Sequence, residues 1–267
     1  MNIEKEQKQA ILDLIQDAGR LILSAHDVEA QKNAITVKPG AANFVTVYDV
    51  KVQQMLIDGL GKLFPDAYVF AEEKNNAAAS FAGAYCFVID PIDGTTNFIH
   101  DMKRSVISVA LFFDGAPVFG AVYDPYMGEM FSAAAGEGAF LNGRPIRVSD
   151  RSLDKALVSF GTSPYNRDET VSATFRRVQS VFMKCADIRR SGTAALDVCY
   201  VACGRTDAYF EDVLSPWDYA AGMLILREAG GTLTDYSGNV PLAGEKSSVL
   251  CSNKLLHPEM LQLINQN

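Results

Sequence analysis

The feature that most constrains the fold of this chain is an apolar strand that runs directly into two carboxylates. Residues 86–89 (CFVI) are followed at once by residues 90–98 (DPIDGTTNF). Two aspartates at this spacing more often belong to an ordinary capped turn. The full string is more demanding, because a proline stiffens it, a glycine permits an unusual φ, and two threonines favour the start of a helix. We therefore expect a buried strand that ends at a functional site.

The residue types in this string suit the binding of a cation and of a phosphate group. Asp90 and Asp93 offer oxygen ligands for hard divalent cations. Backbone N–H groups of Gly94 and Thr95, close to the start of a helix, can hold a phosphate group. The string thus indicates chemistry on a phosphate ester with the help of a bound cation.

Two further acidic positions extend this pattern. Glu72 and Glu73 end an expected strand, and Asp218 lies in the first turn of an expected helix. Alone, each has an ordinary interpretation, as exposed loop acids or as a helix N-terminal aspartate favoured by the helix dipole. Two neighbouring strands that both end in acids would place Glu72 near Asp90. Such a cluster, with few basic residues nearby in sequence, is mutually repulsive unless cations occupy it.

The overall charge restricts the classes of partner. The formal net charge of the 267 residues is −8, which argues against broad nucleic-acid binding and anionic-membrane binding, since both need clustered Lys and Arg. The longest obvious apolar stretch, residues 106–113, is too short to span a membrane. An acidic enzyme also repels a phosphate ester, and a bound divalent cation is the simplest way to invert the local field.

The cysteines and the N-terminal residues predict a reducing compartment. The five cysteines are an odd number without a C-x-x-C pair, so we expect free thiols rather than a disulfide framework or a zinc site. Residues 1–10 carry charges without a following apolar core, so no signal peptide is expected. We therefore expect a cytoplasmic protein.

Apolar periodicity predicts helices and strands in both halves of the chain. Asp114-Gly115 and Asn142-Gly143 are strong hairpin signals, so the first half reads as a helix pair followed by a largely antiparallel meander. We expect helices over 3–25, from just after Asp49 to Pro65, and over 169–184, 193–203 and 217–229. We expect strands over 68–71, 85–90, 105–113, 118–123, 129–134, 139–141, 146–148, 157–160, 187–190, 208–210, 232–234 and 248–252, and an irregular loop over 32–43. The order of elements favours helices layered against sheets.

Taken together, these motifs resemble the inositol monophosphatase family. The resemblance rests on Glu72-Glu73, on residues 90–95 and on Trp217-Asp218, in this order and at these separations. It extends to residues 43–46 (NFVT) before Asp49, 136–143 (GEGAFLNG), 191–195 (SGTAA) and 228–231 (EAGG). It therefore covers nearly the whole chain and is very specific.

The resemblance implies an α/β (α+β) fold, the layered αβαβα sandwich of the lithium-sensitive, Mg²⁺-dependent phosphatases. It implies one catalytic domain over residues 1–267, in which residues 1–150 carry the metal motif and residues 151–267 complete the site. It also implies a homodimer that acts on a small-molecule phosphate ester, most simply inositol monophosphate or a similar small polyol phosphate.

The resemblance also implies a ligand set of two to three Mg²⁺ ions. One ion would be held by Glu72, Asp90 and the carbonyl of Ile92. A second would be held by Asp90, Asp93 and Asp218, and a third, weaker ion would lie near Glu72. Two cations about 4 Å apart can activate water and stabilise the leaving alkoxide, so no covalent nucleophile is required.

The same resemblance assigns catalytic and substrate-binding residues. Thr95 and Asp49 would orient and deprotonate the attacking water, with Glu72 as a third catalytic residue. The phosphate would contact the amides of Gly94 and Thr95. The residues expected to border the substrate are Asp93, Gly94, Thr95, Gly192, Thr193, Ala194, Glu211 and Asp218.

Three features depart from the family pattern or are ambiguous. Residues 101–104 (DMKR) are more charged than expected after the acid motif and could alter a subunit interface or the rim of the site. Arg189-Arg190 could add positive potential before Gly192 or could be an ordinary surface pair. His100 follows the acid motif closely, and we expect it to be structural.

Several alternatives remain open at this stage. The same chemistry could act on fructose 1,6-bisphosphate, histidinol phosphate or 3′-phosphoadenosine 5′-phosphate. A different class of function is an interaction scaffold for the transcription machinery, as in some bacterial relatives. A passive cation-binding protein would explain the acids but not Asp49, Gly94 and Thr95.

Overall fold

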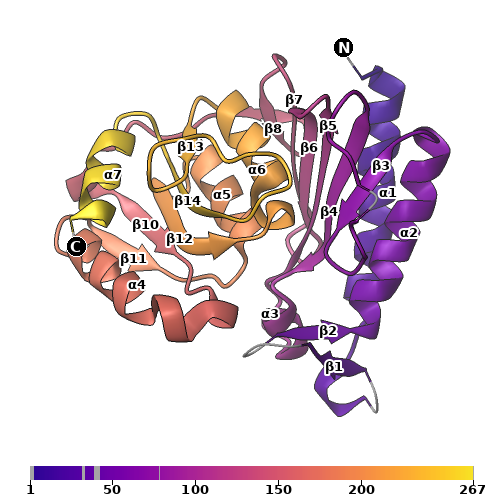
Figure 1. The fold of residues 1–267 in the computed structure, drawn as a ribbon, viewed down its shortest axis with the longest axis horizontal. Coiled ribbons are helices and arrows are strands. Elements are labelled where there is room, and N and C mark those ends of the chain that lie inside the picture. Colours follow the sequence, from indigo (N-terminus) through magenta and orange to yellow (C-terminus); the bar gives the residue numbers. More distant parts are fainter. Residues whose placement is uncertain (1–2, 32–33, 39–42, 78, 267) are drawn as a thin grey trace.

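Helices and sheets alternate in five layers (Figure 1). The computed structural model describes residues 3–31, 34–38, 43–77 and 79–266. One outer layer holds α1 (Lys5–Leu23) and α2 (Val47–Leu63), and the opposite outer layer holds α4 (Arg167–Phe182) and α7 (His257–Asn265). Between the two sheets lie α5 (Ala194–Ala202) and α6 (Pro216–Glu228). The predicted αβαβα sandwich is confirmed.

The larger sheet has seven strands in chain order. They are β3 (Tyr68–Ala71), β4 (Tyr85–Asp93), β5 (Val106–Phe113), β6 (Ala116–Asp124), β7 (Glu129–Ala134), β8 (Ala139–Leu141) and β9 (Arg144–Ile146). All neighbours are antiparallel except β3 and β4, which run parallel. The predicted meander is therefore correct from β4 onward, and the parallel first pair brings two strand ends together at one edge.

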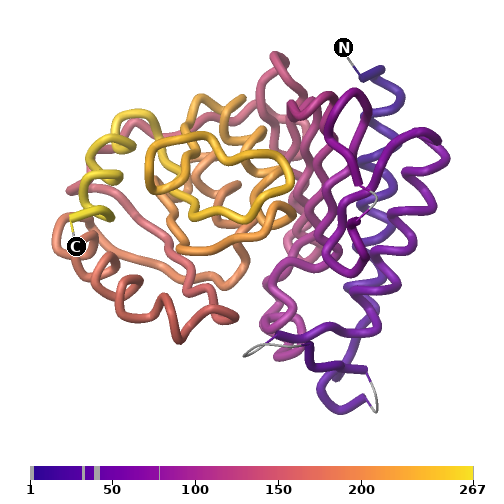
Figure 2. Tube along the Cα trace, viewed as in Figure 1, coloured from indigo at the N-terminus to yellow at the C-terminus, as the bar shows by residue number. Residues whose placement is uncertain are grey.

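The smaller sheet has five strands in the order β11-β10-β12-β14-β13. Their bounds are β10 (Leu157–Phe160), β11 (Asp187–Arg189), β12 (Ala208–Leu214), β13 (Thr232–Thr234) and β14 (Ser247–Ser252). Strand β10 is parallel to β11 and β12, whereas β14 is antiparallel to β12 and β13. The N-terminus lies beside the outer helices of the larger sheet and the C-terminus beside those of the smaller one (Figure 2).

Some sequence predictions of local structure were wrong. The strand expected over 146–148 is Arg144–Ile146, because Asn142 and Gly143, both with positive φ, make a tight turn that starts the return strand at once. The loop expected over 32–43 contains β1 (Ile35–Val37), which pairs with β2 (Phe44–Thr46). Its residues 32–33 and 39–42 lie outside the described residues. Helix α7 and the three short 3₁₀ helices (Val28–Ala30, Leu153–Lys155 and Pro164–Asn166) were not predicted.

Apolar faces hold the layers together. On α1, Ile11, Ile15 and Ile22 are fully buried against the larger sheet, as the helical spacing predicts. Helix α6 packs closely on the other face of that sheet. Gly120 allows this approach, since a Cβ there would lie 2.8 Å from the carbonyl oxygen of Ala221. Among the described helices, none is long and apolar enough to cross a membrane.

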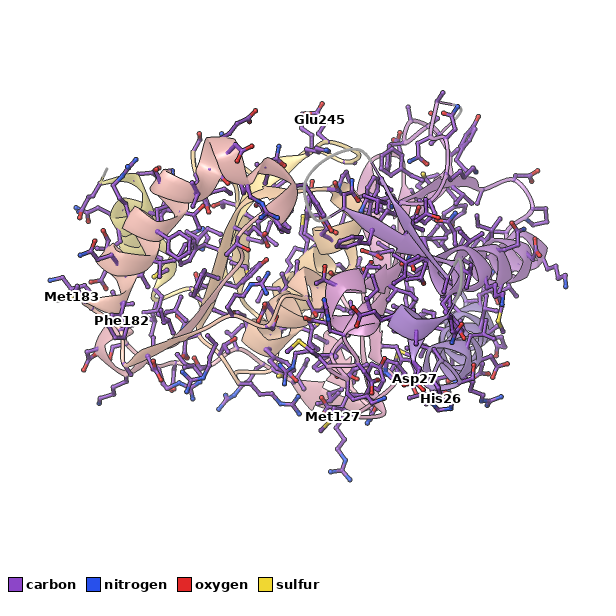
Figure 3. All side chains as sticks on the ribbon, turned by 90° about the horizontal axis from the view of Figure 1, so that it is seen from below. His26, Asp27, Met127, Phe182, Met183 and Glu245 are labelled. Atoms are coloured by element: carbon purple, nitrogen blue, oxygen red, sulfur yellow. The ribbon has the colours of Figure 1, made fainter. Side chains whose placement is uncertain are left out.

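Some large apolar side chains are exposed on the surface, and the thiols are free. Phe182 and Met183 project at the far end of the molecule, 50% and 73% exposed (Figure 3). All five cysteines are free, and Cys86, Cys199 and Cys251 are buried.

Candidate active site

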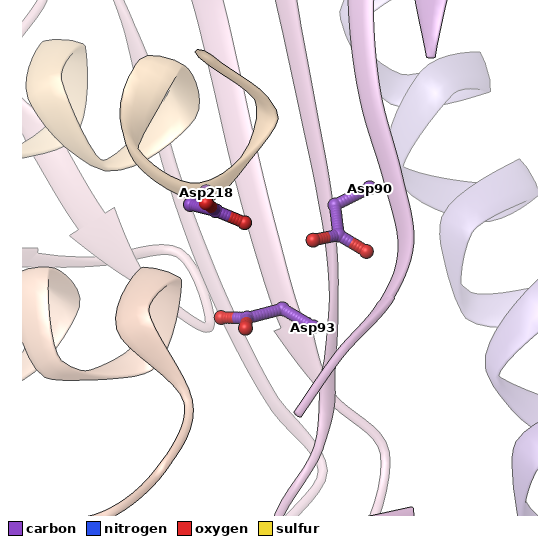
Figure 4. Close-up of side chains that lie close together, drawn as sticks. All are labelled: Asp90, Asp93 and Asp218. Atoms are coloured by element: carbon purple, nitrogen blue, oxygen red, sulfur yellow. The ribbon is translucent and has the colours of Figure 1, made fainter. Parts of the chain in front are cut away.

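Three aspartates from two elements, one strand and one helix, meet between the two sheets. Asp90 and Asp93 lie at the end of β4, and Asp218 lies in the first turn of α6 (Figure 4). The pairing of β4 with β5 shifts register between Asp90 and Asp93, which are only 1% and 8% exposed. Carboxylate oxygens of the three residues lie within 4.8 Å of one another. The structure therefore gathers the predicted acids from both halves of the chain.

Protein donors satisfy only part of what these carboxylates can accept. The N–H of Ile92 donates to Asp90 at 3.0 Å, the N–H of Ala195 to Asp93 at 2.7 Å, and the N–H of Ser215 to Asp218 at 2.7 Å. An ionised carboxylate can accept about four hydrogen bonds. Acceptor capacity therefore remains for metal ligation.

Burial and mutual repulsion disfavour three negative charges here. Burial raises the pKa of Asp93 to about 8, and it raises the pKa of Asp90 and Asp218 well above the usual range. Neighbouring carboxylates add to each of these upward shifts of pKa. Hard divalent cations, which prefer such oxygen ligands, would offset both effects. The donor set thus fits the magnesium sites that the sequence predicts.

The parallel pairing of β3 with β4 brings Glu72 into the same cavity, although Glu72 is not one of the three acids whose oxygens lie within 4.8 Å of one another. Ala71 is paired with Ile89, so the next residue, Glu72, donates its N–H to the Ile89 carbonyl at 3.2 Å. Its carboxylate lies 3.2 Å from the ammonium of Lys38, which also contacts Glu73. Burial raises the pKa of Glu72 to about 7 even though Lys38 opposes this shift. No local motif marks Lys38, which lies 34 residues upstream of Glu72.

Asp49 and Thr95 form a pair beside the aspartates. The hydroxyl of Thr95 lies 3.3 Å from Asp49 Oδ1 and 3.1 Å from the carbonyl oxygen of Ile92. The other carboxylate oxygen of Asp49 accepts the N–H of Thr46 at 2.8 Å. Asp49 therefore lies inside the first turn of α2, in a capping box, rather than before the helix as predicted. Burial raises the pKa of Asp49 to about 6.

Gly94 joins the acid motif to the turn at Gly192. Its φ is +88°, and a Cβ there would lie 2.6 Å from Thr193 Oγ1 and 3.1 Å from the carbonyl oxygen of Arg104. Asn97 Nδ2 lies within 3.1 Å of three acceptors, which are Thr193 Oγ1 and the carbonyl oxygens of Arg104 and Ser191. The predicted phosphate and alcohol regions are therefore directly connected.

Glu211 lies at the other side of the cavity, on β12. Its Oε1 accepts the N–H of Ser163 at 2.6 Å and the Ser163 hydroxyl at 3.2 Å, and its Oε2 accepts the Tyr209 hydroxyl. Burial raises its pKa, whereas these donors and the charge of Arg190 oppose the shift. Gly161 is required beside it, because a Cβ there would lie 1.9 Å from Glu211 Oε2. Glu211 is thus held in place by the protein.

A cavity of about 540 Å³ connects these groups. The predicted residues that line it are Glu72, Asp90, Ile92, Asp93, Gly94, Thr95, Gly192, Thr193, Ala194, Glu211 and Asp218. Asp49 lies behind Thr95 and is fully buried. Cavity residues that sequence reasoning did not select include Lys38, Tyr165, Asp197 and Lys246.

The three ambiguous sequence features, which are Arg189-Arg190, residues 101–104 and His100, lie in different surroundings in the structure. Both arginines are exposed, but Arg190 lines the cavity whereas Arg189 pairs with Asp187. Residues 101–104 are exposed, and the contribution of this segment to the site is the backbone carbonyl of Arg104. His100 is exposed at the end of α3 (Thr95–Ile99), beside a separate cavity of about 390 Å³. Of the described histidines, His257 is the one buried in the core, between Thr234 and Ser252.

The five layers and the acid cluster at their centre define the class of αβαβα sandwich phosphatases. The chain belongs to the inositol monophosphatase family, which it matches over residues 4–267. It is 39% identical over 222 residues to the Nus factor SuhB of Escherichia coli K12, covering 83% of this chain and 82% of that protein. It is 38% identical over 231 residues to the inositol-1-monophosphatase of Synechocystis, covering 86% and 79%.

Solved structures agree with this assignment. The extragenic suppressor protein suhB from Bartonella henselae has a TM-score of 0.88 at 32% identity, covering 97% of this chain and 98% of that one. SaIMPase-II with bound inositol monophosphate has a TM-score of 0.78 at 27% identity, covering 95% and 91%. An IMPase/NADP phosphatase complexed with NADP and Ca²⁺ has a TM-score of 0.85 at 27% identity, covering 100% and 98%.

Proposed function

We propose that this protein is a Mg²⁺-dependent phosphomonoesterase that hydrolyses inositol monophosphate, or a similar small polyol phosphate, to the alcohol and inorganic phosphate. The observation that carries the proposal is the convergence of Asp90, Asp93 and Asp218 within 4.8 Å, beside the Asp49–Thr95 pair. A passive cation-binding protein needs the carboxylates but has no use for this pair.

The metal ligands in this proposal are Glu72, Asp90, Asp93, Asp218 and the carbonyl oxygen of Ile92. When bound, two to three Mg²⁺ ions would activate the attacking water, neutralise phosphate oxygens and stabilise the leaving alkoxide. The backbone hydrogen bonds to Asp90, Asp93 and Asp218 fix one oxygen of each, so the remaining oxygens are oriented before a cation binds.

The other site residues orient water and substrate. Thr95 Oγ1 can take a proton from the attacking water as it passes its own proton to Asp49 Oδ1, 3.3 Å away, so that the water's proton is in effect transferred to Asp49. The capping box holds Asp49 so that this oxygen faces Thr95. Gly94 keeps the phosphate region free of a side chain, and its positive φ turns the chain into α3.

The residues on the alcohol side of the site suit a substrate whose leaving group is a small polar alcohol. Gly192, Thr193, Ala194 and Glu211 line the cavity beyond the aspartates, and Glu211 keeps acceptor capacity for a hydroxyl group. The bound inositol monophosphate of SaIMPase-II, in the same fold, supports this assignment. We also propose a cytoplasmic homodimer, consistent with five free thiols and with the family.

The same chemistry on a different ester is the first alternative. The family fold also holds NADP and Ca²⁺ in one solved neighbour, so larger phosphate esters fit this architecture. Fructose 1,6-bisphosphate, histidinol phosphate and 3′-phosphoadenosine 5′-phosphate are therefore the competing substrates.

A role as a scaffold for the transcription machinery is the second alternative. It is favoured by the relatives named Nus factor SuhB, at 39% identity to the Escherichia coli protein. Such a role needs the surface rather than the acid cluster. Asp90→Asn should therefore abolish phosphatase activity and leave binding to transcription proteins intact, whereas loss of both would tie the two roles to one site.

The test of the main proposal is phosphate release from inositol 1-phosphate and the three competing esters, with Mg²⁺ and with EDTA. We expect turnover only with Mg²⁺ and the highest kcat/KM on inositol 1-phosphate. Asp58→Asn, an exposed carboxylate on α2, is the matched control for Asp90→Asn. Turnover that persists in EDTA, or in Asp90→Asn, would contradict the metal assignment.

A further inference from the structure

Asn97 is a buried amide to which the proposed reaction gives no role. It lies on α3, two residues after Thr95, and it is only 4% exposed at the wall of the cavity. Burial of an amide costs free energy unless its polar atoms are hydrogen-bonded. The side chain of Asn97 meets this need by leaving α3 and crossing to residues 191–193 in the second half of the chain.

Three acceptors surround the amide nitrogen of Asn97. The carbonyl oxygen of Arg104 lies 2.9 Å from Nδ2, that of Ser191 lies 3.0 Å away, and Thr193 Oγ1 lies 3.1 Å away. The hydroxyl of Thr193 in turn donates to the Arg104 carbonyl at 3.0 Å. Because this donation uses the only hydroxyl proton, Thr193 Oγ1 acts as an acceptor toward Asn97. The directions of these hydrogen bonds are thus mutually fixed.

The turn at residues 191–193 is also held by hydrogen bonds of its own. Ser191 Oγ accepts the N–H of Thr193 at 3.1 Å, and its proton is donated to the buried carboxylate of Asp197. The turn is therefore one hydrogen-bonded unit at the start of α5. Asn97 ties this unit to α3.

The two elements that Asn97 joins carry different parts of the proposed reaction. Helix α3 begins with Thr95, which is assigned with Asp49 to the attacking water. The 191–193 turn leads into the residues assigned to the alcohol part of the substrate. Hydrolysis requires the attacking oxygen, the phosphorus atom and the leaving oxygen to lie roughly in line. The separation of α3 from the turn therefore sets this alignment.

We propose that Asn97 is a positioning residue, which aligns the leaving oxygen of the substrate with the attacking water by holding the 191–193 turn against α3. This inference rests on the proposed phosphatase function. The N–H groups of Asn97 are used within the protein, so its effect passes through Thr193 and the turn. A misplacement of about 1 Å between reacting groups can lower a rate by about 10²-fold, even when the altered residue touches neither reactant.

The test is the kinetics of Asn97→Ala on inositol 1-phosphate and on an aryl phosphate. For inositol 1-phosphate, kcat should fall by about 10- to 100-fold while KM changes by no more than about twofold, because alignment is lost but the groups that bind the substrate remain. For the aryl phosphate, kcat should fall by no more than about threefold, since an aryl leaving group has no hydroxyl groups by which the turn could align it.

Asn253→Ala is the matched control. Asn253 is also buried, and its Nδ2 donates to Ser149 Oγ at 3.1 Å and to the Arg151 carbonyl at 3.2 Å, in a distant segment of the chain. It is not among the described residues that border the cavity. Its loss should lower the melting temperature as the loss of Asn97 does, without changing the ratio of the two kcat values. An equal change of this ratio in both variants would reduce Asn97 to a support of the fold and overturn the inference.

A double-mutant cycle tests the route through Thr193. Thr193→Val removes the hydroxyl and should lower kcat for inositol 1-phosphate, whereas Thr193→Ser keeps the hydroxyl and should lower it less. If Asn97 acts through this hydroxyl, Asn97→Ala combined with Thr193→Val should be no more than about twofold slower than the slower single variant. Fully multiplicative losses would show that Asn97 acts independently of the turn and would overturn the inference.

The activity of the wild type separates this inference from the proposed function. A wild type that hydrolyses neither ester would overturn both. An active wild type, together with an Asn97→Ala variant that loses kcat equally on the two esters or loses none, would overturn the inference and leave the phosphatase function standing.

Discussion

The two ends of the cavity contain buried carboxylates that differ in how many hydrogen bonds they accept from the protein. At one end, Asp90, Asp93 and Asp218 each accept one backbone N–H and repel one another. At the other end, Glu211 accepts three hydrogen bonds from Ser163 and Tyr209. The first end is incomplete without cations, whereas at the second the protein supplies three of the about four hydrogen bonds that a carboxylate can accept.

This difference separates two kinds of contribution to function. An incomplete acid cluster gains its binding free energy when a cation arrives, so its residues couple metal binding to stability. A carboxylate that the protein already holds is pre-organised, and little further ordering is needed when a substrate hydroxyl binds. Substitutions at the two ends should therefore affect turnover, specificity and stability in different proportions.

The largest effect is expected from Asp90→Asn. It should lower turnover on every ester by at least ~10²-fold, because this residue is assigned to both metal ions. In EDTA the same change should raise the melting temperature, since it removes one buried negative charge from a repulsive cluster. Scanning calorimetry with and without Mg²⁺ measures this, and the variant should also lose the stabilisation that Mg²⁺ gives the wild type. Near-normal turnover would disprove the two-metal assignment.

A smaller and selective effect is expected from Glu211→Ala. It should lower kcat/KM for inositol 1-phosphate by about tenfold while sparing an aryl phosphate, because only the polyol offers hydroxyl groups to this carboxylate. It should also destabilise the fold by about 1–3 kcal/mol, since buried donors of Ser163 and Tyr209 lose their acceptor.

Glu211→Gln is the control that keeps the shape and one acceptor oxygen. Steady-state kinetics on both substrates, with denaturant titration of each variant, distinguish the two contributions. If hydrolysis of both substrates falls equally in Glu211→Ala, the residue supports the site or the fold and does not discriminate polyols.

The smallest effect on turnover is expected from Asp197→Asn, which lies between the two ends. Asp197 is buried on α5 and accepts the hydroxyl of Ser191, whose oxygen in turn accepts the N–H of Thr193 at 3.1 Å. An asparagine can accept the same hydrogen bond, so turnover should change by no more than about threefold.

The pH dependence of the free energy of unfolding should reveal the raised pKa of Asp197. Burial raises the pKa of Asp197 from its ordinary value of 3.8 to about 7. The folded protein thus holds a proton that the unfolded chain releases, and the wild type should lose stability relative to Asp197→Asn as pH rises from about 4 to 7. The expected difference is on the order of a few kcal/mol, measured by denaturant titration at several pH values. Parallel curves would show that Asp197 has an ordinary pKa.

The sequence predicted the layers and the acid cluster because both have local signals. Apolar periodicity defines most helices and strands, and the string at 90–98 is specific in itself. The position of Glu72 beside Asp90 could be expected only if their strands were neighbours, and the parallel pairing of β3 with β4 confirms this.

Other parts of the site could not be predicted, because they depend on contacts between distant segments. Ser163 lies 48 residues from Glu211, and Lys38 lies 34 residues from Glu72, with no motif at either donor. Tyr165 reaches the cavity from the short 3₁₀ helix Pro164–Asn166, which was not predicted. Asp197 looked like an ordinary helical residue, because helical spacing alone does not tell which side of α5 faces the Gly192 turn.

The contacts of Asn97 determine when, during folding, the site can take its final geometry. This amide, from the first half of the chain, binds the Ser191 carbonyl and Thr193 Oγ1 in the second half, and Asp93 binds the N–H of Ala195. During synthesis, the acid motif in the first half can therefore reach its final geometry only after some 100 further residues have been added to the chain. The final geometry of the site therefore requires both halves to be docked, and recovery of turnover during refolding would report this docking.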